Sequence, residues 1–182
     1  MNTVAKSRTY RMILCALFAA LIAVGAFLRV PVPYVPFTLQ TFFVALAGLL
    51  LGKKLGAVSA LVYMAIGLIG IPVFTEGGGI AYVLKPTFGY IVGFVLGAYV
   101  TGAIARKVET PSLGRLIAAV FAGFGVTYLL GMTYFYFMSN FYLGKAIGVG
   151  TVLLYCFLVF VPGNGVMGVI AALVAKIGRA HV

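Results

Sequence analysis

The stretch TEGGGIAYVLKPTFGY, residues 75–90, gathers polar chemistry that is scarce elsewhere in the chain. It carries a carboxylate, Glu76, followed by three glycines and then an ammonium, Lys85. Lys85 stands just before Pro86 and Thr87, where an apolar segment begins, so a cation and the free amides of a helix N-terminus together suit an anionic group. The glycines can expose backbone amides and carbonyls to the same ligand. This stretch therefore predicts that the protein binds a solute.

Two further polar stretches lie beside prolines. In VPYVPFTLQT, residues 32–41, Gln40 carries a carboxamide that is costly against lipid, so we expect it to face the protein interior. In VPGNGVMG, residues 161–168, Asn164 offers two donors and an acceptor where a proline and glycines weaken the helix. The candidate ligand-binding residues are Thr38, Gln40, Glu76, Gly77, Gly78, Gly79, Tyr82, Lys85, Thr87, Tyr90 and Asn164.

Structural explanations compete with this interpretation. Thr38 fits a helix cap, and Glu76 fits a solvated surface carboxylate. A lysine at a helix entrance, such as Lys85, commonly extends its ammonium to the membrane interface. Tyrosines near helix ends commonly form an interfacial aromatic belt. The residues around Asn164 fit a simple helix kink.

Side chains for catalysis are nearly absent. The chain has two acidic residues and one histidine, His181, which lies far in sequence from the polar stretches. These residues form no carboxylate cluster for a metal and no nucleophile–histidine arrangement, and the chain has no GxxxxGK[ST] phosphate loop. Cys15 and Cys156 lie in apolar runs, so we interpret them as packing residues. We expect no enzyme, no cofactor and no metal site.

The composition places the chain in a lipid bilayer. Hydrophobic residues make up 64% of it and charged residues 8%, whereas soluble domains carry about 25% charged residues. The net charge of +11 does not indicate nucleic-acid binding, because the basic residues sit in small groups between apolar runs. We predict a multi-pass protein of the cell membrane, with residues 1–182 forming a single transmembrane substrate-binding domain.

Six apolar segments fit membrane-spanning helices. The predicted fold class is an all-α integral membrane protein, a compact bundle of six transmembrane helices. The second and third segments are short for a span, which needs about 20 apolar residues, and the sixth is a candidate for a break near Pro162 and Gly163. The predicted spans are 11–28, 37–51, 55–71, 87–105, 116–138 and 147–175.

The basic residues orient this bundle. With the N-terminus in the cytoplasm, most of the basic residues fall on the cytoplasmic side, as the positive-inside rule requires. Both termini are then cytoplasmic, and the glycine-rich loop 72–86, between the third and fourth spans, is extracellular and caps a pocket. The cytoplasmic residues are Lys6, Arg8, Arg11, Lys53, Lys54, Arg106, Lys107, Arg115, Lys176 and Arg179. The extracellular residues are Arg29, Lys85 and Lys145.

Small residues recur every four positions, which lets helices approach closely. The rows are Gly48, Gly52 and Gly56; Gly89, Gly93 and Gly97; and, in the first span, Ala16 with Ala20 and Ala19 with Ala23. Spacing alone leaves two alternatives open, packing within the bundle or docking onto another membrane subunit. The pocket itself suits a small, largely apolar solute with one anionic end and one compact polar end.

Four motifs resemble the BioY family. BioY proteins are the biotin-specific, substrate-capturing S components of ECF-type ABC transporters. The resemblance covers nearly the whole chain, in order. The motifs are VPFTLQTFFVALAGLLLG at 35–52, YMAIGLIGIPVFTEGGG at 63–79, KPTFGYIVGF at 85–94 and FVPGNGVMGVIAALVA at 160–175.

The resemblance implies biotin capture and uptake by the substrate-binding subunit of an ATP-driven vitamin importer. Biotin would be the transported ligand, and its thioether ring, ureido group and carboxylate fit the solute described above. The implied partners are a membrane coupling subunit and two cytoplasmic ATPase subunits, which agrees with the missing phosphate loop. The alanines that match the family's coupling-subunit contact are Ala16, Ala19, Ala20 and Ala23.

The sequence departs from the family at three positions. Asn164 and Met167 stand where Asp and Lys are common, and Lys85 stands where Gly is usual, which makes Lys85 a candidate partner of the carboxylate. A small secondary transporter for another vitamin or small organic anion is an alternative, but it needs an ionisable group within a span, and neither acid lies in one. A structural membrane protein without a ligand is disfavoured by the polar residues at one face.

Overall fold

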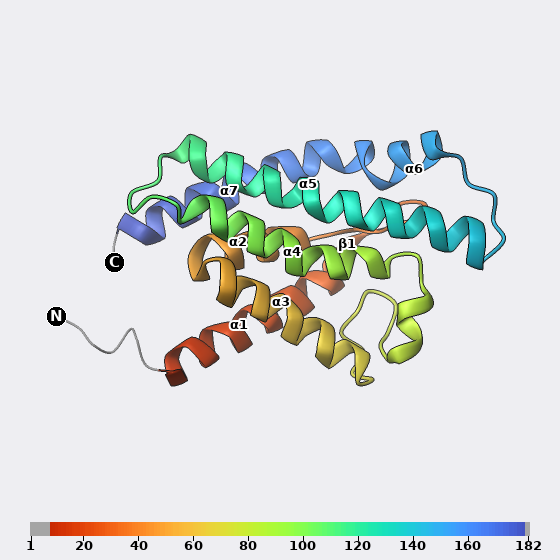
Figure 1. Ribbon diagram of the computed structural model, residues 1–182, viewed down its shortest axis with the longest axis horizontal. Coiled ribbons are helices and arrows are strands. Elements are labelled where there is room, and N and C mark those ends of the chain that lie inside the picture. The colour runs from red at the N-terminus through yellow and green to blue at the C-terminus, as the bar shows by residue number, and fades with distance from the viewer. Residues whose placement is uncertain (1–7, 181–182) are drawn as a thin grey trace.

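A computed structural model describes residues 8–180 as a bundle of helices with one minimal pair of strands (Figure 1). Lys6 and His181, used above, lie outside the described residues. The α-helices are α1 Arg8–Phe27, α2 Gln40–Leu51, α3 Lys53–Leu68, α4 Phe88–Ala105, α5 Leu113–Phe137, α6 Val149–Cys156 and α7 Val161–Ala180. The shorter elements are β1 Arg29–Val30, β2 Phe37–Thr38, the 3-10 helices η2 Ile80–Leu84 and η4 Leu158–Phe160, and the π-helical turn η3 Met138–Tyr142.

Four helical segments are long and apolar enough to cross a membrane. They are Arg8–Phe27, Phe88–Ala105, Leu113–Tyr142 and Val149–Gly178, which match the predicted first, fourth, fifth and sixth spans. The predicted second and third spans are the shorter helices α2, of 12 residues, and α3, of 16 residues. At 1.5 Å per residue both are shorter than the roughly 30 Å hydrocarbon core. Gly52 alone links them, with φ 84° and ψ 179°, a backbone conformation that favours glycine.

The start of α2 corrects the sequence prediction. Phe37 and Thr38 form a strand instead of the first helical turn, pairing antiparallel with β1 in the register Arg29 with Thr38. The helix begins at Gln40, and Leu39 occupies the N-cap position without a side-chain hydrogen bond. The alternative that Thr38 is a helix cap is therefore wrong.

The sixth span breaks five residues before the proline that was expected to break it. The backbone turns at Phe157, with φ −141° and ψ −64°, and η4 follows. Pro162 is instead the second residue of α7. A proline in the first turn of a helix is tolerated because its missing N–H would have no intrahelical partner there.

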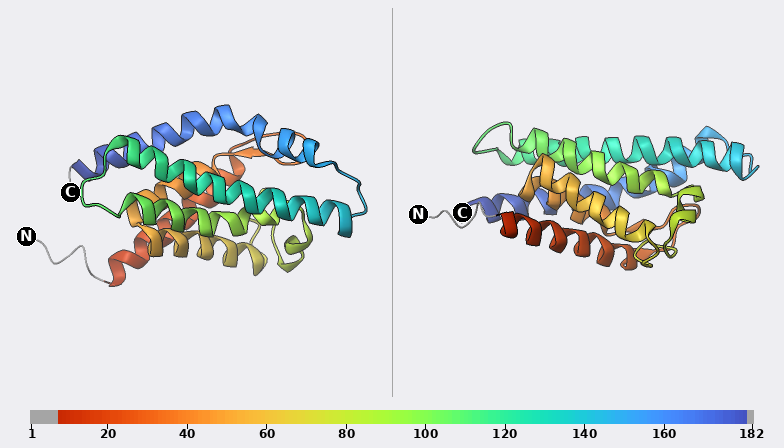
Figure 2. Two further views of the ribbon diagram at one scale, coloured as in Figure 1. Left: turned by 45° about the horizontal axis from the view of Figure 1, so that its top comes forward. Right: turned by 60° about the horizontal axis from the view of Figure 1, so that its bottom comes forward.

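The glycine rows pack helices inside the bundle, which confirms one of the two alternatives for them. Figure 2 shows α4 and α5 side by side along their lengths, and they form the most extensive helix pair. A Cβ atom on Gly93 would lie 2.8 Å from the Thr127 carbonyl oxygen, so only glycine permits this approach. The Thr127 hydroxyl donates to the carbonyl oxygens of Gly93, at 3.1 Å, and Gly123, at 3.0 Å. These bonds satisfy a hydroxyl that is buried among apolar helices.

The alanine row of α1 faces two ways. Ala19 is only 3% exposed and belongs to the bundle core, so it is not on the outer face where docking onto a partner was expected. Ala16 and Ala20 are exposed, and Ala23 is half-buried. The outward row is therefore shorter than the sequence predicted.

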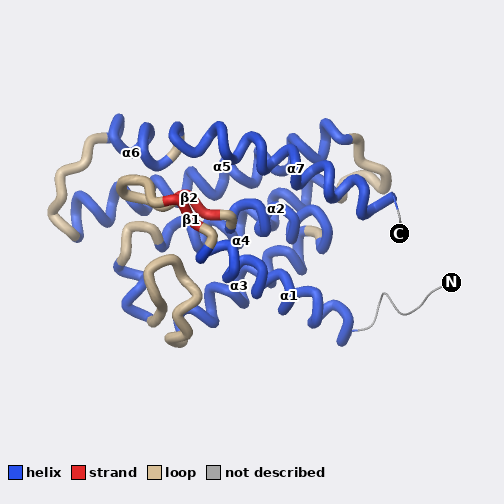
Figure 3. Tube along the Cα trace, turned by 180° about the vertical axis from the view of Figure 1, so that it is seen from behind, coloured by secondary structure: helices blue, strands red, loops and turns tan. Residues whose placement is uncertain are grey.

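Most of the basic residues lie on elements that share one end of the bundle. The start of α1, the end of α7, the α2–α3 corner and the α4–α5 connection lie at one end, and the loop before η2 and the β1–β2 connection lie toward the other (Figures 1 and 3). Arg106 at the first end donates to the Leu50 carbonyl, and the Arg115 Nε donates to the Ile104 carbonyl at 3.0 Å. These bonds satisfy helix carbonyls where the chain turns.

Candidate functional site

A cavity of about 50 Å³ lies beneath the loop that joins α3 to α4. Its wall combines the segment before α2, the ends of α3 and α4, the middle of α5 and η4. Most of its lining is aromatic or aliphatic, with hydroxyls and one carboxamide between. The lining residues are Val35, Pro36, Phe37, Thr38, Gln40, Thr41, Tyr63, Thr75, Tyr82, Thr87, Tyr90, Ile91, Phe94, Tyr128 and Phe160.

Gln40 lies inside the protein, as its carboxamide requires. It is 4% exposed, and its Nε2 donates to the Tyr63 hydroxyl at 2.8 Å. Its Oε1 accepts from the Thr38 hydroxyl at 3.2 Å, and the Tyr63 hydroxyl donates to the Val73 carbonyl at 3.2 Å. This chain of bonds ties the entrance of α2 to the end of α3 and fixes the polar rim of the cavity.

A second buried network joins α2, α5 and α7 behind the cavity wall. Asn164, 4% exposed, accepts from the Thr41 hydroxyl at 3.1 Å and donates through Nδ2 to the Tyr128 hydroxyl. This pattern orients both hydroxyls. The Thr41 O–H donates to Asn164, so the Thr41 oxygen is left to accept a hydrogen bond from a ligand. The Tyr128 oxygen accepts from Asn164, so the Tyr128 O–H is left to donate. The cavity therefore presents one acceptor and one donor from neighbouring helices.

Aromatic rings form an apolar slot beside these hydroxyls. Phe37 stacks on Phe160 with ring centres 5.8 Å apart and planes at 21°, and Tyr128 stacks on Phe160 at 6.1 Å and 30°. Tyr90 meets Tyr128 edge to face at 5.8 Å and donates to the Cys156 carbonyl at 3.0 Å, where the sixth span breaks. The break thus brings Phe160 to the cavity. It also leaves the Cys156 carbonyl at the end of α6, and the Tyr90 hydroxyl satisfies this carbonyl.

Thr87 has a spare hydrogen-bonding group at the cavity. Its Oγ1 is buried, and among the described residues it has no hydrogen-bond partner. Thr87 occupies the N-cap position of α4, yet its side chain caps no amide. Because a buried polar atom without a partner is costly, this hydroxyl marks a position that a ligand atom can satisfy.

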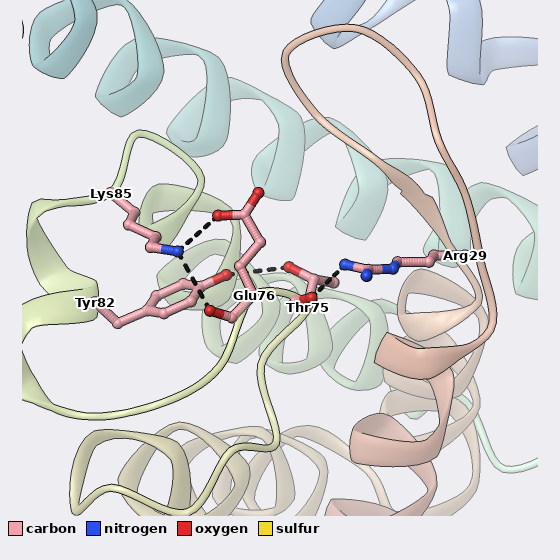
Figure 4. Close-up of polar contacts among 5 residues, drawn as sticks. All are labelled: Arg29, Thr75, Glu76, Tyr82 and Lys85. Atoms are coloured by element: carbon pink, nitrogen blue, oxygen red, sulfur yellow. Dashed lines mark hydrogen bonds and ion pairs between the residues drawn. The ribbon is translucent and has the colours of Figure 1, made fainter.

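Figure 4 shows the loop that roofs the cavity and the ion pair on it. The Lys85 Nζ lies 2.7 Å from the Glu76 Oε2 and 3.3 Å from the Glu76 carbonyl oxygen, and it sits 5.0 Å from the centre of the Tyr82 ring. The two charged side chains are 40% and 48% exposed and do not line the cavity. Their direct contact with a ligand therefore stays a prediction.

Two further bonds hold the same loop. The hydroxyls of Thr75 and Tyr82 lie 3.0 Å apart, and the guanidinium of Arg29 donates to the Thr75 carbonyl. The three glycines shape the loop instead of lining the cavity. Gly77 and Gly79 have φ of 113° and 102°, and the Gly79 amide donates to the carbonyl at the end of α3 at 2.7 Å.

Comparisons with known proteins place this geometry in a family. The model of the BioY family matches residues 1–182. The chain belongs to the BioY family. A probable biotin transporter BioY of Lysinibacillus sphaericus is 45% identical over 92% of this chain and 86% of that protein. The biotin transporter BioY of Thermotoga maritima is 42% identical over 91% of this chain and 93% of that protein.

A solved structure agrees with the fold of this BioY chain. The crystal structure of the S-component for biotin from an ECF-type ABC transporter superposes with a TM-score of 0.85 at 28% identity, covering 99% of this chain and 95% of that one. The match confirms the all-helical membrane fold predicted from the sequence. The relatives are named as transporters, in agreement with the expectation that this BioY chain is no enzyme.

The predicted site residues of this BioY chain fall into three groups. Thr38, Gln40, Tyr82, Thr87 and Tyr90 line the cavity. Asn164 lies directly behind the wall and orients two lining hydroxyls. The remainder, Glu76, Gly77, Gly78, Gly79 and Lys85, form the roof without lining the cavity.

Four polar lining residues were not among the candidates. Thr41 follows Gln40 directly, so its place at the start of the same helix was a usable signal. Thr75 lies in the loop stretch 75–90 beside Glu76, and its hydroxyl gives a weaker signal of ligand binding than the neighbouring carboxylate. Tyr63 and Tyr128 sit within apolar helices, where the sequence does not distinguish a lining tyrosine from one in the packed core.

Proposed function

We propose that this protein captures biotin as the substrate-binding S component of an ATP-driven vitamin importer. The observation that carries the proposal is the cavity beneath the α3–α4 loop, which pairs an aromatic slot with a hydroxyl donor and a hydroxyl acceptor of fixed direction. Membership of the BioY family and the names of the relatives support the same ligand.

The cavity chemistry matches the two ends of biotin's ring system. The thioether ring is apolar and fits the slot between Phe37, Phe160 and Tyr128. The ureido group needs a donor for its carbonyl and acceptors for its N–H groups. Tyr128 supplies the donor, and Thr41 and Thr87 supply acceptors, one of which has no other partner among the described residues.

The loop must move for biotin to enter. A space of about 50 Å³ holds a few water molecules, which is too small for a bicyclic vitamin with a side chain. The exposed Lys85–Glu76 ion pair and the bonds to Thr75 hold one part of the roof. Phe74 holds another part, because it is 1% exposed and packs against Tyr63 and Tyr82. Exposed ion pairs contribute only about 0–1 kcal/mol, so the segment around Glu76 and Lys85 can open at low cost while Phe74 stays packed in the bundle.

We propose that Lys85 receives the carboxylate of bound biotin. The supporting observation is its ammonium on the roof, 2.7 Å from a carboxylate of the protein. A ligand carboxylate arriving at the roof would replace Glu76 as the partner of Lys85. This exchange keeps the ammonium paired in both states, and the released Glu76 carboxylate, which is 48% exposed, is solvated by water.

We infer the place of the chain in the transporter from the asymmetry of its ends. The single domain would lie with both termini in the cytoplasm, because the basic α2–α3 and α4–α5 connections share that end, and with the cavity roof outside. A membrane coupling subunit would dock on the outward alanines of α1, Ala16, Ala20 and Ala23. Two cytoplasmic ATPase subunits would supply the energy for transport.

Titration calorimetry of the detergent-purified protein with biotin tests the proposal. We expect saturable one-to-one binding, with weaker binding of biotin methyl ester because the ester lacks the charge proposed to meet Lys85. The absence of saturable heat at micromolar biotin would reject biotin as the ligand. Parallel titrations with other vitamins would then identify the class of solute. Neither acid of the chain lies in a helix, so no observation favours an ion-driven secondary transporter.

A further inference from the structure

A second hollow of the molecule lies on the outer surface between α1 and α3. It is a groove of about 550 Å³, larger than the cavity beneath the loop. Its lining residues are Arg8, Arg11, Met12, Cys15, Ala16, Leu55, Val58 and Val62. A comparable surface groove of about 220 Å³ lies between α5 and α6, but its lining contains no charged residue. The combination of aliphatic walls and two guanidinium groups is what distinguishes the α1–α3 groove.

The position of the groove is fixed by the packing of its two helices. α1 and α3 begin at the same end of the bundle and run in the same direction (Figure 2). The Cys15 thiol lies 3.6 Å from the Leu55 carbonyl oxygen, near the start of α3. Arg11 and Arg8 precede Cys15 by about one and two helical turns, so they stand at the mouth of the groove. The basic pair Lys53–Lys54 begins α3 at the same end.

The groove floor is chemically suited to a hydrocarbon chain. Apart from the two arginines, its lining residues carry no ionised side chain, and Met12 and Val58 are 61% and 42% exposed. Inside a bilayer this surface meets lipid tails, which fill such a hollow by van der Waals contact. A lipid keeps the two guanidinium groups at the level of its own headgroup, where its phosphate lies.

We propose that the α1–α3 groove binds one anionic phospholipid, with its phosphate at Arg8 and Arg11 and an acyl chain along Leu55, Val58 and Val62. Basic pockets between membrane helices at the cytoplasmic surface bind anionic headgroups in this way. The proposal depends on the membrane embedding of the chain and not on biotin as its ligand. Ala16 belongs both to this groove and to the outward alanine row, so the lipid occupies part of the surface proposed for the coupling subunit.

The chain offers a position-specific test because it contains no tryptophan. The variant Met12→Trp places a single fluorophore at the groove. It is reconstituted in phosphatidylcholine vesicles with a small fraction of lipid carrying brominated, quenching tails, either phosphatidylglycerol or phosphatidylcholine. We expect phosphatidylglycerol to reach half-maximal quenching at a roughly tenfold lower mole fraction. Adding Arg8→Gln and Arg11→Gln should abolish that preference.

A matched control separates this site from general attraction to a basic surface. Lys107 and Lys176 are exposed and do not line the groove. Replacing both by Gln in the Met12→Trp background removes the same charge, and we expect the preference to stay within twofold. Thermal unfolding of each variant verifies that it is folded, whether or not the protein binds biotin.

Three results would overturn the proposal. Equal quenching by the two lipids would show that the groove does not select an anionic headgroup. An equal loss of preference in the Lys107 and Lys176 control would assign it to overall charge. If the arginine variant keeps the preference but no longer copurifies with the coupling subunit, the groove is a protein-docking surface instead.

Discussion

Asn164 is a buried amide that orients two hydroxyls of the cavity wall. It accepts a hydrogen bond from the Thr41 hydroxyl and donates one to the Tyr128 hydroxyl, and both partners are neutral groups. Its place near the start of α7 follows from the break at Phe157, which lets the chain re-enter the bundle beside the cavity. The residue is thus positioned by the irregular backbone and in turn orients the polar contacts.

We predict that Asn164→Ala weakens biotin binding by about tenfold or more and lowers the melting temperature moderately. The change leaves the buried Thr41 and Tyr128 hydroxyls short of a partner, at about 1–3 kcal/mol per unsatisfied group. Calorimetry and thermal unfolding measure the two effects. Asn140→Ala is the control, because this amide bonds Tyr136 and Ile147 in the α5–α6 connection and does not line the cavity. Normal biotin affinity in Asn164→Ala would mean that the site is misplaced.

A substitution of Thr87 distinguishes a role in ligand binding from a role in stability. Because its Oγ1 has no partner among the described residues, Thr87→Val should leave stability unchanged or slightly raise it. Biotin affinity should fall by roughly five- to tenfold, since one hydrogen bond to the ligand is lost. Thr133→Val, whose hydroxyl bonds the Leu129 carbonyl on the outer face of α5, is the comparison. Unaltered binding in Thr87→Val would remove Thr87 from the site.

At the scale of elements, the loop between α3 and α4 is the segment that we propose opens the cavity. Its Lys85–Glu76 ion pair has two possible roles, in which Lys85 binds the biotin carboxylate or the pair only holds the loop closed. Variants that change the charge distinguish the two roles. If Lys85 meets the biotin carboxylate, Lys85→Ala should weaken biotin binding by several-fold and binding of the uncharged methyl ester much less. Glu76→Gln should then strengthen biotin binding, because it removes the internal competitor for the ammonium.

The opposite pattern has a different meaning. If the pair acts only as a latch on the roof, Glu76→Gln and Lys85→Ala should both speed the dissociation of biotin and of its ester to the same extent. Stopped-flow dissociation rates at low and high salt distinguish the two cases, because an exposed pair is screened by salt. Equal losses for acid and ester would contradict the assigned role of Lys85.

Four of the described helical segments were predictable from the sequence because each is an apolar run long enough to span the membrane. The shortness of α2 could be read from its sequence too, but the irregularities of the backbone could not. The one-residue corner at Gly52 and the break at Phe157 depend on tertiary packing. A break was predicted at Pro162, but this proline lies in the first turn of α7, where a helix tolerates it. The two-residue strand at Phe37 has no local pattern of its own and exists through its pairing with β1.

The part of the site that was predictable from the sequence is the set of carboxamide side chains in otherwise apolar segments. Gln40 and Asn164 could be placed inside because a carboxamide facing lipid is costly. Tyr63 and Tyr128 could not, since a tyrosine in an apolar helix serves equally well as packing. The pairing of Glu76 with Lys85 also escaped prediction, because it depends on loop glycines with positive φ that fold the chain back on itself.

At the scale of the whole molecule, the outward face of α1 is the surface that we propose for docking onto the coupling subunit. Ala16→Leu with Ala20→Leu enlarges exposed positions, so we predict normal folding and biotin binding but weaker copurification with the coupling subunit. Ala19→Leu is the internal comparison. It overpacks the core, at about 1–3 kcal/mol, and should lower the melting temperature. Undiminished copurification of the exposed double variant would place the docking surface elsewhere.

The most direct test of this account is a structure of the protein with biotin bound. We predict the ring system between Phe37, Phe160 and Tyr128, its ureido group within hydrogen-bonding distance of Thr41, Thr87 or Tyr128, and the α3–α4 loop closed above it. Biotin bound outside the cavity, or in a cavity wall from which these side chains have turned away, would contradict it.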